Sequence, residues 1–87
     1  MAVINWTKKA RKQLAPIPWH DVERIIDAVE SLAKWPDAAN IKKLSNRDDY
    51  RLRVGRYRVL FTVTPGNDVT VILIEEVKKR DEHTYQS

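Results

Sequence analysis

Residues 51–61 read RLRVGRYRVLF, and this alternation of apolar and basic residues around one glycine constrains the fold more than any other stretch. Successive side chains of a strand point to opposite faces, so the period of two on both sides of Gly55 predicts two half-buried strands. Glycine at the first position of a two-residue loop favours a type II′ turn, which makes Gly55-Arg56 the loop of a β-hairpin. Val54 then pairs with Tyr57.

This register assigns the alternating side chains to two faces. The apolar set, which we expect to pack against the core, contains Tyr50, Leu52, Val54, Tyr57, Val59 and Phe61. On the other face Arg53 lies directly opposite Arg58, with Arg51 diagonal to it. Like charges directly opposite each other destabilise a sheet, and a guanidinium group stays charged. These arginines therefore extend into water, bind an external anion, or pair with carboxylates, for which the candidates are Asp48, Asp49, Glu75 and Glu76.

The N-terminal half has a helical period instead. Residues 3–6 form a short apolar run that predicts an edge strand. Thr7 is a good N-cap for a helix that runs to about Ala15, and the following Pro-Ile-Pro ends that helix. Apolar residues then recur every three to four positions across 19–34, which predicts a second helix and hence a helical hairpin.

The chain after the arginine hairpin predicts one more strand. Residues 65–68 read PGND, a typical turn, and 69–77 are expected to form a strand. Its residues 71–74 are apolar at consecutive positions, which indicates a central strand covered on both sides. We therefore expect an α+β fold in which an N-terminal strand and a helical hairpin pack on an antiparallel β-sheet. Residues 1–87 are expected to form a single domain.

Composition excludes several functional classes. The chain has no cysteine and two histidines, so we expect no metal site and no cofactor. No apolar run approaches the roughly 20 residues that span a bilayer, and the N-terminus lacks the apolar centre of a signal peptide. We therefore expect a cytoplasmic protein without a membrane association. The formal net charge is +4, and residues 42–58 hold seven basic residues against two acidic ones, which favours an anionic partner.

The segment KKLSNRDDYRLRVGRYRVLFTV, followed by VTVILIEEVKKRDEHTY, resembles the RelE/ParE superfamily of bacterial type II toxins, and so does the order of the expected elements. The tight hairpin and the basic ending before a tyrosine are more similar to the RelE branch, whose members cut mRNA, usually on the ribosome. ParE-like members inhibit DNA gyrase instead. The resemblance implies a metal-independent endoribonuclease in which the ribose 2′-OH attacks the adjacent phosphate. A ParE-like gyrase inhibitor and a non-catalytic basic interaction module are the alternatives.

The resemblance also implies roles for particular residues. The best-known member has lysines where this chain has Arg51 and Arg53, and an arginine cannot serve as a base. The basic position after the last strand corresponds to Lys79 or to Arg80. The expected catalytic residues are Arg53 and Arg58 as phosphate clamps, Arg80 at the leaving group or phosphate, and His83 or Tyr85 for proton transfer. The expected RNA-binding residues are Arg51, Lys79, Lys43, Arg47 and Arg56.

Partners follow from the same resemblance. Toxins of this kind are held inactive by a cognate antitoxin, which also supplies the DNA binding of the complex, so we expect no direct DNA binding by this chain alone. The other expected partners are mRNA and the ribosome. We expect Trp6, Trp19 and Trp35, which flank helix ends, to seal the core rather than to stack on bases.

Overall fold

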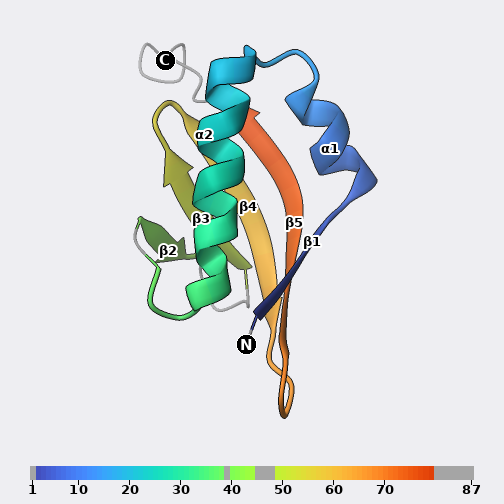
Figure 1. The fold of residues 1–87 in the computed structure, drawn as a ribbon, viewed down its shortest axis with the longest axis vertical. Helices are drawn as coiled ribbons and strands as arrows, with labels where there is room; N and C mark the ends of the chain where they lie inside the picture. Colours follow the sequence, from blue (N-terminus) through green and yellow to red (C-terminus); the bar gives the residue numbers. More distant parts are fainter. Residues whose placement is uncertain (1, 39, 45–48, 80–87) are drawn as a thin grey trace.

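The computed structural model describes residues 2–38, 40–44 and 49–79, which form two helices and a five-stranded sheet (Figure 1). The elements in chain order are β1 (Ala2–Trp6), α1 (Lys8–Leu14), α2 (Trp19–Glu30), the 3₁₀ turn η1 (Ser31–Lys34), β2 (Ile41–Lys43), β3 (Asp49–Val54), β4 (Tyr57–Thr64) and β5 (Thr70–Lys79). The predicted α+β class is confirmed, and so are the N-terminal strand and the pair of helices. In these residues no helix has the length and apolar character needed to cross a membrane.

The sheet is mixed rather than wholly antiparallel. Its strand order is β1-β5-β4-β3-β2, and β1 runs parallel to β5, whereas the other neighbours are antiparallel. Parallel neighbours need a long connection, and here almost the whole chain lies between them. β5 lies inside the sheet as expected, but it is covered on one face only, since Val71 on the other face is 37% exposed.

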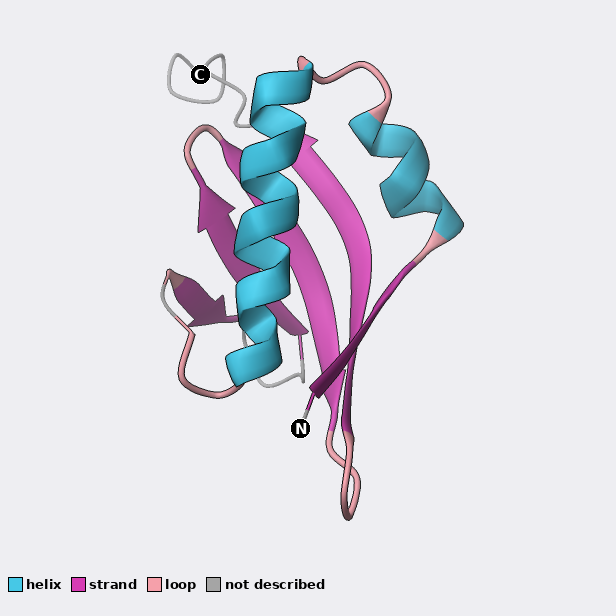
Figure 2. Ribbon diagram, viewed as in Figure 1, coloured by secondary structure: helices cyan, strands magenta, loops and turns pink. Residues whose placement is uncertain are grey.

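α2 and η1 cover one face of the sheet, α1 lies beside the edge of β5, and the core lies between the helices and the sheet (Figure 2). α2 contributes Ile25 and Val29, both almost fully buried, and η1 contributes Leu32. Their predicted spacing along one helix face is confirmed, although the last turn is 3₁₀ rather than α-helical. The sheet side of the core consists of Leu52, Tyr57, Val59, Phe61, Val63, Ile72, Ile74 and Val77.

The tryptophans divide into two groups. Trp6 and Trp35 are half-buried against the core, and the Trp35 ring meets Tyr50 edge-on with a centroid distance of 4.8 Å. Both therefore seal the core as predicted. Trp19 does not, because 62% of its surface is exposed to solvent. The prediction is wrong for Trp19 because it stands in the first turn of α2, outside the helix face that meets the sheet.

α1 protects the edge of β5 where β1 ends. The Thr7 amide donates to the Ile74 carbonyl at 2.9 Å, and the Thr7 hydroxyl donates to the Glu75 carbonyl at 3.1 Å. Further along, the Val77 amide donates to Gln13 Oε1 at 2.7 Å. Thr7 Oγ1 also accepts from the Ala10 amide at 3.0 Å, which confirms the predicted N-cap. Backbone groups of β5 that lack a neighbouring strand are thereby satisfied.

A bulge in β5 sets the orientation of the strand's last residues. Phe61 pairs with Ile74 and Leu60 pairs with Glu76, so Glu75 is an extra residue in the ladder. Strict alternation after Ile74 would have turned Glu76 into the core. The bulge instead returns Val77 to the core and leaves Glu76 on the uncovered face.

Candidate nucleic-acid interface

The hairpin at residues 54–57 has the predicted register. Val54 pairs with Tyr57 and Arg53 pairs with Arg58. Gly55 has a φ of +57°, a conformation that glycine adopts without strain, and Arg56 is not among the described residues with positive φ. This combination matches the type II′ turn expected from the sequence.

Two rows of side chains cross the uncovered face of the sheet. The row nearer the hairpin loop consists of Arg53, Arg58 and Lys78 on three neighbouring strands. The next row consists of Lys42, Arg51, Leu60 and Glu76 on four strands. Neighbouring strands lie about 4.8 Å apart, so each cation has another cation beside it. We call these five basic side chains the cation rows.

The arginines of the first row have no internal counter-ion in the described part of the chain. Neither Arg53 nor Arg58 forms an ion pair there, and the Nε of Arg58 is buried without a hydrogen-bond partner. A buried donor without an acceptor costs about 1–3 kcal/mol. Of the alternatives left open by the sequence, pairing with a described carboxylate is therefore excluded for these two arginines.

Glu76 is engaged elsewhere. Lys9 Nζ lies 2.8 Å from Glu76 Oε1, and Lys78 Nζ lies 3.8 Å from Oε2. The hydrogen bond from Lys9 lowers the pKa of Glu76 although burial opposes the shift. The Glu76 carboxylate thus stays charged, pairs mainly with a lysine of α1, and offsets the charge of Lys78 only weakly.

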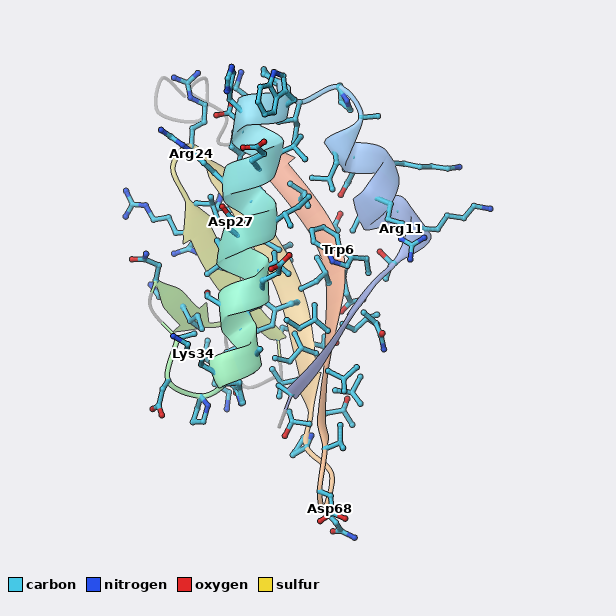
Figure 3. All side chains as sticks on the ribbon, in the orientation of Figure 1. Trp6, Arg11, Arg24, Asp27, Lys34 and Asp68 are labelled. Carbon is cyan, nitrogen blue, oxygen red and sulfur yellow. The ribbon has the colours of Figure 1, made fainter. Side chains whose placement is uncertain are left out.

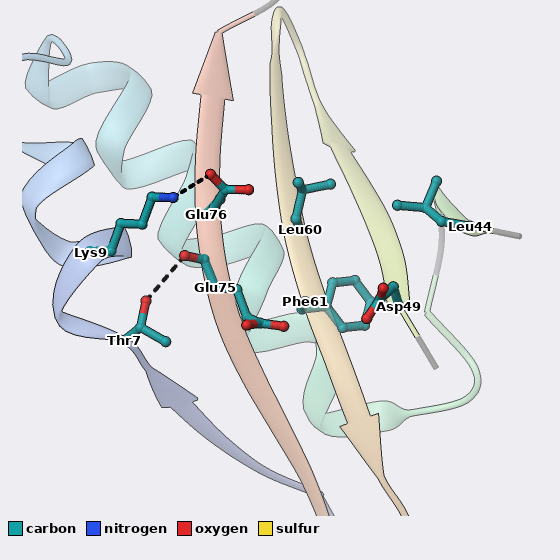
Figure 4. A pocket seen from close by; sticks show the side chains of 8 residues that line it. All are labelled: Thr7, Lys9, Leu44, Asp49, Leu60, Phe61, Glu75 and Glu76. Atoms are coloured by element: carbon teal, nitrogen blue, oxygen red, sulfur yellow. Dashed lines mark hydrogen bonds and ion pairs between the residues drawn. The ribbon is translucent and has the colours of Figure 1, made fainter. Parts of the chain in front are cut away.

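A hollow of about 320 Å³ adjoins the cation rows on the same face (Figure 4). It is lined by Thr7, Lys9, Leu44, Asp49, Leu60, Phe61, Glu75 and Glu76. Leu60 and Glu76 belong both to this hollow and to the second row, so the two features are continuous. The lining combines apolar surface with carboxylate oxygens, a composition that suits a planar ring carrying amino groups next to a phosphate bound by the cations.

The structure brings some of the predicted site residues together and separates others. Arg51, Arg53 and Arg58 share the uncovered face, while Lys43 pairs with Tyr50 and points to the helix side of edge strand β2. Lys79 lies opposite Tyr57, so it too is on the helix side and apart from the arginines. Arg56 is in the hairpin loop. Four predicted site residues lie outside the described residues: Arg47, Arg80, His83 and Tyr85.

Sequence reasoning missed Lys78. The signal that could have found it is the register beyond the bulge, since Lys78 reaches Arg58 only if one residue of β5 is left unpaired. Charged Glu75-Glu76 in the middle of an otherwise apolar strand was a hint of such an irregularity. Periodicity alone does not reveal where the extra residue falls.

A hydrogen bond on the helix side of the sheet holds the hairpin to α2. Tyr57 Oη donates to Asp21 Oδ2 at 3.1 Å. Burial of the ring, together with this hydrogen bond and the nearby Asp21 charge, raises the pKa of Tyr57, so the phenol remains protonated and keeps donating. This bond fixes the start of β4, and with it Arg58, relative to the helix layer.

The described residues thus form a small α+β domain whose open sheet face carries Arg53 and Arg58 without an ion-pair partner among those residues, an arrangement that suits an anionic ligand. A family model described as the ParE toxin of the type II toxin–antitoxin system parDE matches residues 4–83. The chain therefore belongs to the RelE/ParE superfamily of type II toxins, as its sequence motifs predicted.

Solved structures agree with this membership. The RelB–RelE antitoxin–toxin complex from Methanococcus jannaschii is 26% identical, with a TM-score of 0.70 over 94% of this chain and 95% of that one. The archaeal RelE–RelB complex from Pyrococcus horikoshii OT3 is 27% identical, with a TM-score of 0.73 over 91% and 94%. The YoeB/ParE toxin from Agrobacterium tumefaciens is 14% identical, with a TM-score of 0.72 over 90% and 98%, and supports the fold alone. No curated protein matches the sequence significantly.

Proposed function

We propose that this toxin is a metal-independent, ribosome-dependent endoribonuclease that cuts mRNA and so inhibits translation. The observation that carries the proposal is the row Arg53–Arg58–Lys78, in which two directly opposed arginines have no ion-pair partner among the described residues. Such an arrangement costs stability, and a phosphate group would relieve it. The RelE structures that are 26% and 27% identical to this chain support the same reading.

The proposed reaction needs positive charge where the phosphate gains negative charge. The 2′-oxygen attacks the adjacent phosphorus and loses its proton, the bond from phosphorus to the 5′-oxygen breaks, and that oxygen takes up a proton. The products are a 2′,3′-cyclic phosphate and a free 5′-hydroxyl end. Arg53 and Arg58 would donate to the non-bridging oxygens, whose charge rises in the transition state. Arg51 would contribute positive charge from the next row. The neighbouring hollow would bind a nucleobase of the RNA.

The proton transfers are proposed for residues of the C-terminal segment. His83 and Tyr85 would exchange protons with the 2′-oxygen and the leaving 5′-oxygen, with Arg80 at the leaving group. The guanidinium groups of Arg51 and Arg53 stay protonated and cannot take the role of base. The proposal therefore assigns binding to the sheet and proton transfer to the segment that follows β5.

The proposed partners are a cognate antitoxin, mRNA and the ribosome, in the cytoplasm. The similar structures from Methanococcus jannaschii and Pyrococcus horikoshii are both toxin complexes with RelB. We propose that DNA binding, where it occurs, comes from the antitoxin.

The matching family model favours a second candidate, a ParE-like inhibitor of DNA gyrase. In that case the cation rows would bind a protein or DNA surface of the gyrase complex and no bond in RNA would break. The third alternative, a non-catalytic basic module, predicts neither RNA cleavage nor gyrase inhibition.

Primer-extension mapping of mRNA ends, with and without ribosomes, tests the proposal, together with analysis of the end groups. We expect new ends only with ribosomes, a 5′-hydroxyl on each downstream fragment and a 2′,3′-cyclic phosphate on each upstream fragment. Arg58→Ala should lower cleavage about 10²- to 10³-fold, the usual effect of removing one transition-state donor. The matched control is Lys34→Ala, which removes an exposed cation at the end of η1, away from the hairpin, and should cut normally (Figure 3).

Gyrase supercoiling assays complete the test. Intact messages together with inhibited supercoiling, in folded protein, would replace the nuclease with the gyrase inhibitor. Intact messages and normal supercoiling would leave the non-catalytic module.

A further inference from the structure

An exposed pair of aromatic rings opens α2. The Trp19 ring stacks on the His20 ring with a centroid distance of 4.2 Å and an interplanar angle of 30°. Trp19 is 62% exposed, far more than any other exposed large apolar residue among those described. A solvent-exposed indole gives up the burial that normally stabilises it, and tryptophan is enriched at interfaces, where its flat ring can contact a ligand.

This pair lies at the same end of the molecule as the arginine hairpin. Asp21, two residues beyond Trp19, accepts the hydrogen bond from Tyr57 at the start of β4. Figure 1 shows the first turn of α2 beside the β3–β4 loop and the end of β5. The rings are therefore on the helix side of the sheet end whose other side carries Arg53 and Arg58.

Cations connect the two sides. Arg56 occupies the loop between β3 and β4, and Lys79 lies opposite Tyr57 on the helix side, while its neighbour Lys78 faces the open side. Arg24 extends from α2 toward the hairpin (Figure 3). Two acidic residues, Asp21 and Glu23, stand on the same turn of α2, and Asp21 is engaged by Tyr57. A band of positive charge thus passes around the end of the sheet from the arginine row to the aromatic pair.

We propose that the Trp19–His20 pair is a stacking platform for a base of single-stranded RNA whose phosphates follow this band from the arginine row. The inference rests on the proposed RNA-directed function and extends it to a second contact, away from the bond that is cut. Flat aromatic rings beside a basic track are the usual means of holding single-stranded nucleic acid, because every base has a face that can stack. The charge of the band favours an anionic ligand over a neutral one, and the flat rings provide the stacking surface that a base of RNA uses. An acidic protein segment would also be attracted by the band, and the antitoxin-binding outcome of the test below separates it from RNA.

Fluorescence of the full-length toxin tests the platform. Trp6 and Trp35 are half-buried, so emission from exposed Trp19 should respond most to a ligand at the surface. The probe is a fully 2′-O-methylated RNA oligonucleotide, which binds but cannot form the cyclic phosphate. Its comparator is an abasic strand of the same length, which offers phosphates without bases. We expect the RNA probe to quench the emission and the abasic strand to leave it unchanged.

Variants separate stacking from charge. Trp19→Ala should weaken binding of the RNA probe about tenfold and leave binding of the abasic strand unchanged, whereas Trp19→Phe should restore most of the affinity. The matched control is Val69→Ala, which shortens an exposed apolar side chain in the β4–β5 loop at the opposite end and should bind normally. Circular dichroism of each variant confirms that it is folded.

Three results would overturn the platform: equal binding by Trp19→Ala and the unaltered toxin, equal quenching by the abasic strand, or loss of antitoxin binding alone in Trp19→Ala. Failure of the proposed nuclease has a different signature, namely uncut mRNA together with normal quenching by the methylated probe. The two inferences can therefore fail separately.

Discussion

The opposed arginines should make the toxin less stable than a chain that lacks one of them. Arg53 and Arg58 are direct cross-strand neighbours, and neither has an ion-pair partner among the described residues. Arg53→Gln keeps much of the side chain and removes the charge, so it should stabilise the fold. The same change should weaken phosphate binding, because it removes one of the two positive charges that are proposed to bind the phosphate.

The magnitude follows from the register. A like-charged pair directly opposite in a sheet destabilises it by about 0.2–1 kcal/mol. For a domain of 87 residues, this range corresponds to a rise in the melting temperature of about 1–8 °C. Arg58→Met should have a larger effect, since it removes the charge and also replaces the buried Nε, which lacks an acceptor, by a methyl group.

Thermal unfolding at low and high salt measures both effects. At about 1 M salt the screening length falls to about 3 Å, so the advantage of Arg53→Gln should shrink. Arg11→Gln is a control that should lower the melting temperature. Arg11 is an exposed cation in the last turn of α1, where a positive charge interacts favourably with the helix dipole (Figure 3). A lower melting temperature for Arg53→Gln, or a difference that salt does not change, would refute the repulsion argument.

Three further substitutions test the scaffold of the site. Gly55→Ala should cost about 1 kcal/mol in a denaturant titration, because φ is +57° although no atom lies within 4 Å of the added methyl group. Tyr57→Phe should cost about 1 kcal/mol at neutral pH, since the bond to Asp21 is lost. The raised pKa of Tyr57 means that the unfolded chain ionises first, so stability should fall above about pH 10 in the unaltered toxin and less steeply in the variant; parallel slopes would contradict this. Glu76→Gln should cost less than about 1 kcal/mol, because Lys9 is largely exposed. Since the pKa of Glu76 is lowered, its contribution is present at neutral pH and is lost as the pH falls below 4.5, so the two proteins should converge in stability in acid.

The arginine hairpin was predictable because two local rules agreed. Alternation fixed the faces and Gly55 fixed the turn, and together they placed Arg53 opposite Arg58, as found. The position of Thr7 as an N-cap was predictable for the same reason, since a side-chain oxygen and the next few amides decide it. Local features of this kind can be predicted from one short segment of the sequence.

The features that sequence reasoning missed depend on distant contacts. β1 pairs with β5, and Thr7 and Gln13 form hydrogen bonds at the bulge around Glu75, so these features bring together residues more than 60 positions apart in the sequence. Strand β2 has three residues, too few for a period to be recognised. Lys78 was missed because its place beside Arg58 requires the bulge to be known. Lys79 was assigned to the site from the family resemblance, and the same bulge puts it on the helix side instead.

The pairing of β1 with β5 also determines how late in its synthesis the toxin can fold. Ala2 lies beside Thr70, and the Thr7 hydroxyl meets a carbonyl 68 positions later, so the first and last strands must both be made before the sheet closes. Contacts over such sequence distances slow folding, since the chain ends must first find each other. A nascent chain in which β5 has not yet been synthesised therefore lacks the pairing of β1 with β5. The sheet can be completed only after β5 has emerged from the ribosome.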